Sequence, residues 1–104
     1  MILYNVTIKI EHDIHKDWLA WMKVVHLPEM MKTGYFIEYT ISRLMGTDES
    51  DGFTYSVQYL MPNFAAYQDY QQEEAAAMQR KHHARYENKY VAFRTIMKVI
   101  ERGE

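Results

Sequence analysis

Residues 2–11 alternate strictly in polarity, and this alternation limits the possible folds more than any other feature of the sequence. A period of two predicts a β-strand with one buried and one open face. The opposite side of the strand carries mostly polar and charged residues, so a sheet covered on one side only is expected. The apolar side consists of Ile2, Tyr4, Val6, Ile8 and Ile10.

Three later segments repeat this period and predict three more strands, at residues 35–45, 53–61 and 90–101. The heptapeptide GTDESDG at residues 46–52 has glycine at both ends and acidic turn residues between them. The second and third strands are therefore expected to form a hairpin.

The faces of these strands follow from the same alternation. In the last strand we place Val91, Phe93 and Met97 toward the core, and Arg94 and Lys98 on the opposite face. That opposite face of the sheet is mixed, with polar residues among single apolar ones. It could simply face water, or it could meet its own copy across a two-fold axis.

Two segments have helical periodicity. The first follows Asp13, a plausible N-cap, and is expected to stop at Gly34. The second is expected to begin at Asn63 as its cap and to run to about Tyr86. The apolar stripe of the first helix is Ile14, Trp18, Trp21, Met22, Val25 and Glu29.

The predicted order is therefore β-α-β-β-α-β. This order is typical of the ferredoxin-like α+β fold, with a four-stranded antiparallel sheet and two helices on one face. A length of 104 residues predicts a single domain covering residues 1–104.

Composition excludes several classes of function. Twelve basic and fourteen acidic residues give a net charge of −2, which argues against nucleic-acid binding. The absence of cysteine excludes disulfides, thiolate metal sites and thiol catalysis, and it fits a reducing compartment. The N-terminal segment becomes charged too early for a signal peptide, and no apolar run is long enough for a membrane span. A cytoplasmic protein is expected.

Four stretches carry a resemblance to a known family. They are ILYNVTI, HLPEMM after the tryptophan pair, YSVQYL, and HARYENKYVAFRTIMKVIE near the C-terminus. The sequence resembles a small bacterial family described as a domain of unknown function and placed among the dimeric α+β barrel proteins. The resemblance covers nearly the whole chain, and HLPEMM and YVAFRT are its most specific parts.

This resemblance implies a ferredoxin-like protomer whose sheet packs face to face against the sheet of a partner, forming a homodimer. The wider superfamily includes cofactor-free monooxygenases, haem-degrading enzymes, lactone isomerases and stress-response proteins, which usually hold ligands between the sheet and the helices. The family itself implies no reaction. The superfamily raises haem binding through His82 as a weak alternative, but nothing else in the sequence supports a cofactor.

The tripeptide His26-Leu27-Pro28 interrupts the first helix. A proline within a helix removes one backbone hydrogen bond and costs about 3 kcal/mol or more, so a kink or break is expected here. The kink could open a pocket with His26 at its edge and Trp18 and Met22 below it. Alternatively, Pro28 only bends the helix around the sheet, and His26 is solvated.

The second helix places polar side chains on its inner stripe. This stripe reads Phe64, Tyr67, Gln71, Ala75, Met78, His82 and Arg85. Buried polar groups need partners or water, at roughly 1–3 kcal/mol for each bond left unmade, so a hydrated or ligand-binding cavity would explain them. Alternatively, the end of the helix overhangs the sheet and leaves His82 and Arg85 in solvent.

Two functions follow from these patterns. The first is a pocket that binds or transforms a small aromatic or lactone-like molecule, with His82 or His26 as a general base titrating near neutrality. The second is a non-catalytic structural or protein-interaction module. No metal site is expected, because His12 and His15 lack a third ligand. The predicted ligand-binding residues are Tyr4, Trp18, Tyr39, Tyr55, Tyr59, Tyr67, His82 and Arg85.

Overall fold

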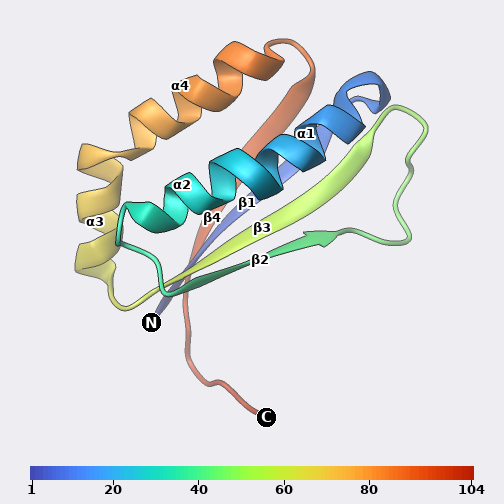
Figure 1. Ribbon diagram of the computed structural model, residues 1–104. Helices are drawn as coiled ribbons and strands as arrows, with labels where there is room; N and C mark the ends of the chain where they lie inside the picture. The colour runs from blue at the N-terminus through green and yellow to red at the C-terminus, as the bar shows by residue number, and fades with distance from the viewer.

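The computed structural model describes residues 1–104 as one antiparallel sheet with helices on one of its faces (Figure 1). The four strands are ordered β2-β3-β1-β4, and every neighbouring pair is antiparallel. The predicted ferredoxin-like α+β fold is confirmed. The strands are β1 (Ile2–Ile10), β2 (Glu38–Arg43), β3 (Phe53–Met61) and β4 (Tyr90–Lys98), and the helical elements are η1 (His12–Ile14), α1 (His15–Trp21), η2 (Met22–His26), α2 (Leu27–Lys32), α3 (Phe64–Glu73) and α4 (Ala75–Tyr86).

The two central strands agree with the sequence pattern. In β1, Tyr4, Ile8 and Ile10 are buried beneath the helices, and in β3 the same holds for Tyr55 and Val57. The turn before β3 is constrained by Gly52, because a Cβ atom there would collide with the carbonyl oxygen of Ile10. The hairpin of β2 and β3 is present as expected.

The face assignment of β4 was wrong by one residue. Arg94 lies directly opposite Val6 of β1 and so shares the face that the helices cover. Val91 and Phe93 instead point to the open face, where they are 69% and 63% exposed. The segment YVAFRTIMK has apolar residues in both alternating sets, and pairing with β1 decides between them.

Strand β2 is shorter than predicted because residues 33–37 follow an irregular path into the sheet edge. Phe36 lies on this path and is buried in the core. Its ring centroid lies 4.9 Å from those of both Tyr59 and Tyr70. Tyr39 lies on the edge strand and is 38% exposed.

The first helical segment continues past Pro28 because it widens just before it. Residues Met22–His26 form a π turn, in which the amide of Leu27 donates to the carbonyl of Met22 five residues earlier. The extra residue rotates the helix, so that Leu27 and Met30 are buried and Val25 is 43% exposed. The predicted stripe was therefore correct up to Met22 and wrong beyond it.

The second helix is divided in two at Glu74, whose backbone leaves helical geometry. Figure 1 shows the change of direction between α3 and α4. Asn63 caps α3 as predicted, because its side chain accepts a hydrogen bond from the amide of Ala66 at 2.9 Å. The break changes the inner face of α3, so Tyr70 is buried and Phe64 is 52% exposed.

Of the two predicted ends of the first helical segment, one is confirmed and one is wrong. Gly34 ends α2 with a positive φ of 85°, as expected for a helix stop. Asp13 does not cap the first helix and instead pairs with Lys89 at 2.8 Å. None of the helices has the length and apolar character that crossing a membrane requires.

Candidate functional site

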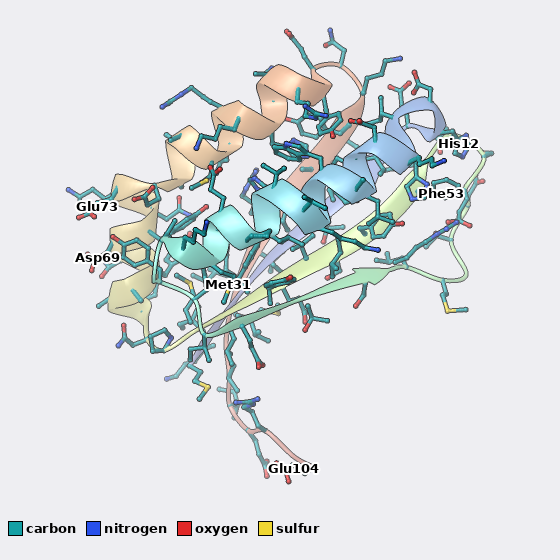
Figure 2. The ribbon with its side chains drawn as sticks, in the orientation of Figure 1. His12, Met31, Phe53, Asp69, Glu73 and Glu104 are labelled. Atoms are coloured by element: carbon teal, nitrogen blue, oxygen red, sulfur yellow. The ribbon has the colours of Figure 1, made fainter.

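A cavity of about 50 Å³ lies between the inner face of the sheet and the helices. Figure 2 shows the side chains that project into this space from both layers. The cavity has room for a few water molecules. Its walls are formed by Tyr4, Val6, Ile8, Met22, His26, Met30, Val57, Tyr59, Tyr70, Met78, Gln79, His82, Tyr90, Ala92 and Arg94.

His82, on the inner side of α4, is held in a defined orientation by α1. Its Nε2 atom accepts a hydrogen bond from the indole N–H of Trp18 at 2.9 Å. A nitrogen that accepts cannot carry the proton, so the neutral ring is protonated on Nδ1 and can donate from that atom. Burial is the main cause that lowers the pKa of His82 to about 4, and the nearby His26 and Arg94 contribute to the same shift.

His26 reaches the same cavity from the π turn. Its ring stacks on that of Trp21, with the centroids 4.8 Å apart, and only 8% of the residue is exposed. Burial lowers the pKa of His26 to about 4. No protein group forms a hydrogen bond with either ring nitrogen, and neither nitrogen is sealed from solvent.

The two imidazoles are therefore neighbours, with ring centroids 6.2 Å apart. Sequence spacing left open whether they share a pocket, and the structure places both on its wall. Both pKa values lie well below the near-neutral range expected from the sequence. At neutral pH the cavity therefore contains two uncharged histidines.

Tyrosine rings form the sheet side and the far end of the cavity. Tyr4 packs against Tyr59 and Tyr70 at centroid distances of 5.9 and 5.8 Å. Burial raises the pKa of all three hydroxyls, so they remain protonated. The cavity thus offers aromatic surfaces with neutral polar tips.

Of the predicted ligand-binding residues, Tyr4, Tyr59 and His82 line the cavity, and the catalytic candidate His26 joins them. Trp18 is fully buried and supports His82 from behind. The other predicted residues lie elsewhere.

Each of the others has a different environment. The Tyr55 hydroxyl lies 2.6 Å from Nε2 of His15, and Tyr39 lies at the sheet edge. Tyr67 does not line the cavity and packs against Tyr4, with the ring centroids 5.8 Å apart. Arg85 is exposed and pairs with Asp17 at 3.3 Å, as the overhang alternative for this residue anticipated.

Sequence analysis missed Tyr70, Tyr90, Gln79 and Arg94. The helix break at Glu74 turns Tyr70 inward, and the register of β4 turns Tyr90 and Arg94 inward. The alternating set of Tyr90, Ala92 and Arg94 was the available signal, but it is less apolar than the competing set.

His12, His15 and His83 lie outside the cavity, and no group of three potential metal ligands occurs in the structure. His12 and His15 pack against Phe53, with centroids 4.8 and 4.4 Å away. In Figure 2, His12 and Phe53 lie at the opposite end of the molecule from Asp69 and Glu73 of α3.

Fold and cavity together define a ferredoxin-like α+β protein with a tyrosine- and histidine-lined space between its layers. The chain belongs to the family described as domain of unknown function DUF4286, whose profile matches residues 1–100. No curated protein matches the chain in sequence.

Solved structures show the same fold at low sequence identity. HapK from Hahella chejuensis has a TM-score of 0.73 at 10% identity, over 100% of this chain and 97% of that one. A dimeric ferredoxin-like protein from an uncultured marine organism has a TM-score of 0.70 at 12% identity, over 100% and 99% of the two chains. A mutant of MhuD with two manganese protoporphyrin IX molecules bound per active site has a TM-score of 0.69 at 13% identity, over 100% and 99%.

Proposed function

We propose that this protein binds a small aromatic or lactone-like molecule in the cavity between its sheet and its helices. The observation that carries the proposal is the convergence of His26 and His82 on one cavity with hydrogen-bonding atoms left over. These nitrogens form no hydrogen bond with the protein and reach solvent, since no side-chain nitrogen or oxygen is both buried and without a partner. A ligand can therefore replace water at these atoms and form hydrogen bonds with both histidines.

The π turn strengthens this interpretation. π turns within helices are rare and occur frequently at functional sites. Here the turn brings His26 and Leu27 to the inner side of the helix. Without the inserted residue, the helix would present the more exposed Val25 instead.

The two histidines have different roles in the proposed site. Nε2 of His82 accepts a hydrogen bond from Trp18, so the ring can serve a ligand as a hydrogen-bond donor through Nδ1. His26 keeps a nitrogen available to accept a proton or a hydrogen bond. If the ligand is transformed, His26 is the group that can act as a base, and a nearby negative charge would strengthen it by raising its pKa.

Haem fits this site poorly. Nε2 of His82 accepts the hydrogen bond from Trp18 and is not available to an iron atom, and the cavity of about 50 Å³ is far smaller than a porphyrin. The structural likeness to MhuD is one of fold and does not support that ligand for this chain.

A thermal-shift screen tests the proposed pocket. Aromatic acids, quinones and lactones are screened at about a hundred times the dissociation constant, where a ligand adds about 2.7 kcal/mol and raises the melting temperature by several degrees. We expect the shift from any bound compound to be lost in His26→Ala and His82→Ala. The exposed His83 of α4 supplies the matched control, and His83→Ala should retain the shift.

The screen also has a clear negative outcome. If no compound shifts the wild-type protein while the histidine variants remain folded, the pocket proposal fails. The alternative of a structural or protein-interaction module would then be the better one.

We further propose that the open face of the sheet forms a homodimer interface. Val91, Phe93 and Met97 of β4 are exposed there, and the half-buried Leu3 of β1 lies opposite Met97. Large exposed apolar patches mark interaction sites.

Polar side chains on this open face already form hydrogen bonds with each other. A partner sheet that covers the face would therefore leave few polar groups without a hydrogen bond. Asn5 donates to Thr7 at 2.9 Å and accepts from Ser56 at 2.6 Å. A structural neighbour described as a dimeric ferredoxin-like protein supports the same arrangement.

Light scattering behind a sizing column checks this interface. The wild type should have twice the mass of one chain at micromolar concentration, and Phe93→Glu should weaken association about a hundredfold, because a glutamate would be buried without a cationic partner. Phe93 lies directly opposite Thr7 in the sheet and is 63% exposed in the single chain, so the monomer should accept the glutamate. Val24→Glu is the matched control, because Val24 is 76% exposed on the helix layer. A monomeric wild type, or equal effects of the two variants, would contradict the sheet-face dimer.

A further inference from the structure

Arg94 is the only formally charged residue on the wall of the cavity. No aspartate or glutamate lines it, and the remaining polar side chains are tyrosines, histidines and Gln79. A cavity with one fixed positive charge and no carboxylate selects for anions. The charge comes from β4, an edge strand of the sheet, where Arg94 lies opposite Val6 on the helix-covered side and remains exposed.

This arginine has no ion-pair partner in the structure. Three of the other arginines do: Arg43 pairs with Glu49, Arg85 with Asp17, and Arg102 with Glu38. Arg94 forms none of the eight salt bridges of the chain. A guanidinium carries five N–H donors in a planar fork that matches a carboxylate.

The field of Arg94 extends over the groups around it. Burial raises the pKa of Tyr4, and the Arg94 charge acts against this rise. The same charge lowers the pKa of His82. The positive charge thus acts on the sheet side and the helix side of the same space.

The other walls favour a flat apolar body next to this charge. Tyr4, Tyr59, Tyr70 and Tyr90 supply ring surfaces from the sheet and from α3. Met22, Met30 and Met78 supply side chains that adapt to the shape of an occupant. The volume of about 50 Å³ is smaller than the roughly 150 Å³ of a cavity that holds one benzene ring, so a single ring can enter only when these methionine side chains move aside.

We propose that the cavity binds a monocyclic aromatic carboxylate, with Arg94 holding the carboxylate at the mouth and the ring lying between the tyrosine wall and His82. Gln79 and the Nδ1–H of His82 are the remaining donors on the helix side of the cavity. This inference rests on the proposed small-molecule pocket. It goes beyond that proposal by assigning the charge of the ligand and the residue that binds the charged group.

Calorimetric titration with benzoate and its neutral counterpart benzamide tests the inference. We expect wild type to bind benzoate about fivefold more tightly than benzamide, which corresponds to about 1 kcal/mol, because the guanidinium of Arg94 is exposed at the mouth and water screens the ion pair. In Arg94→Gln that ratio should fall to near one, and Arg94→Lys should restore part of it. Arg80, on α4 and outside the cavity, also lacks an ion pair, so Arg80→Gln should keep the wild-type ratio.

The outcomes separate the inference from its premise. If benzoate and benzamide bind equally and Arg94→Gln changes neither affinity, the pocket proposal stands and the proposed preference for an anion is wrong. If neither compound binds while quinones or lactones still shift the melting temperature, only the proposed preference for an anion is wrong. Binding of nothing at all would remove the pocket and the anion together. Melting curves of each variant without ligand establish that it is folded.

Discussion

Lowering the pH from about 7.5 to about 5 should destabilise this protein by several kcal/mol. Each of His26 and His82 has a pKa of about 4 in the folded chain, against an ordinary value of 6.5. Between these two pH values the two histidines are protonated in the unfolded chain and neutral in the folded chain. The free energy of unfolding therefore falls as the pH falls. The contribution is complete above about pH 6.5 and is lost progressively down to about pH 4.

The expected loss is on the order of 2 kcal/mol for each histidine at about pH 5. Both residues are at least nine-tenths buried, so water stabilises the positive charge of a protonated ring only weakly. Their charges also repel, since His26 lowers the pKa of His82, and the protons will bind in two steps that belong to the pair. Typical domains are stable by 5–15 kcal/mol, so this loss is a large fraction of the total.

Urea denaturation at a series of pH values measures this effect. His82→Gln keeps an acceptor for the Trp18 N–H and removes one titrating group, so it should reduce the pH dependence by about half. His83→Gln, on the exposed side of the same helix, should keep the dependence of the wild type. A free energy of unfolding that stays constant between about pH 7.5 and 5 would show that the two histidines are not buried as a neutral pair.

The fold could be predicted because its signals are local and repeated. Alternation in residues 2–11 and 53–61, the turn of residues 46–52, and the cap at Asn63 each indicate one element without help from the others. Their order then leaves few arrangements, of which the ferredoxin-like sheet is the simplest.

The cavity was harder to predict because it depends on three departures from ideal periodicity. The π turn shifts the inner face of the first helical segment, the break at Glu74 shifts that of the second, and the register of β4 exchanges Arg94 for Phe93. Each departure moves a face by about one residue, which an ideal period of 3.6 or 2 cannot anticipate. Pro28 was the one visible sign of the first departure, and Arg94 remained hidden among apolar neighbours.

Trp18 connects the two helical segments through the cavity wall. It is fully buried, its ring packs on Tyr55 with the centroids 5.0 Å apart, and its N–H fixes the His82 ring. Trp18→Phe should therefore cost about 2–4 kcal/mol, through the volume that is lost and through the His82 acceptor that is left without a partner. Trp21 forms the matched control, because its ring is only half-buried and no protein acceptor binds its N–H. Trp21→Phe should cost about 1 kcal/mol or less.

A second measurement separates the hydrogen bond of Trp18 from its volume. The indole N–H can bond only to an unprotonated Nε2, so removing it should raise the pKa of His82 toward its ordinary value. In Trp18→Phe the destabilisation between about pH 7.5 and 5 should accordingly be smaller than in wild type, even though the protein is less stable at the higher pH. NMR titration of the His82 ring would report the change directly. An unchanged pKa, or equal losses of stability for the two tryptophan variants, would mean that Trp18 only fills space, and the orientation of His82 would then need another cause.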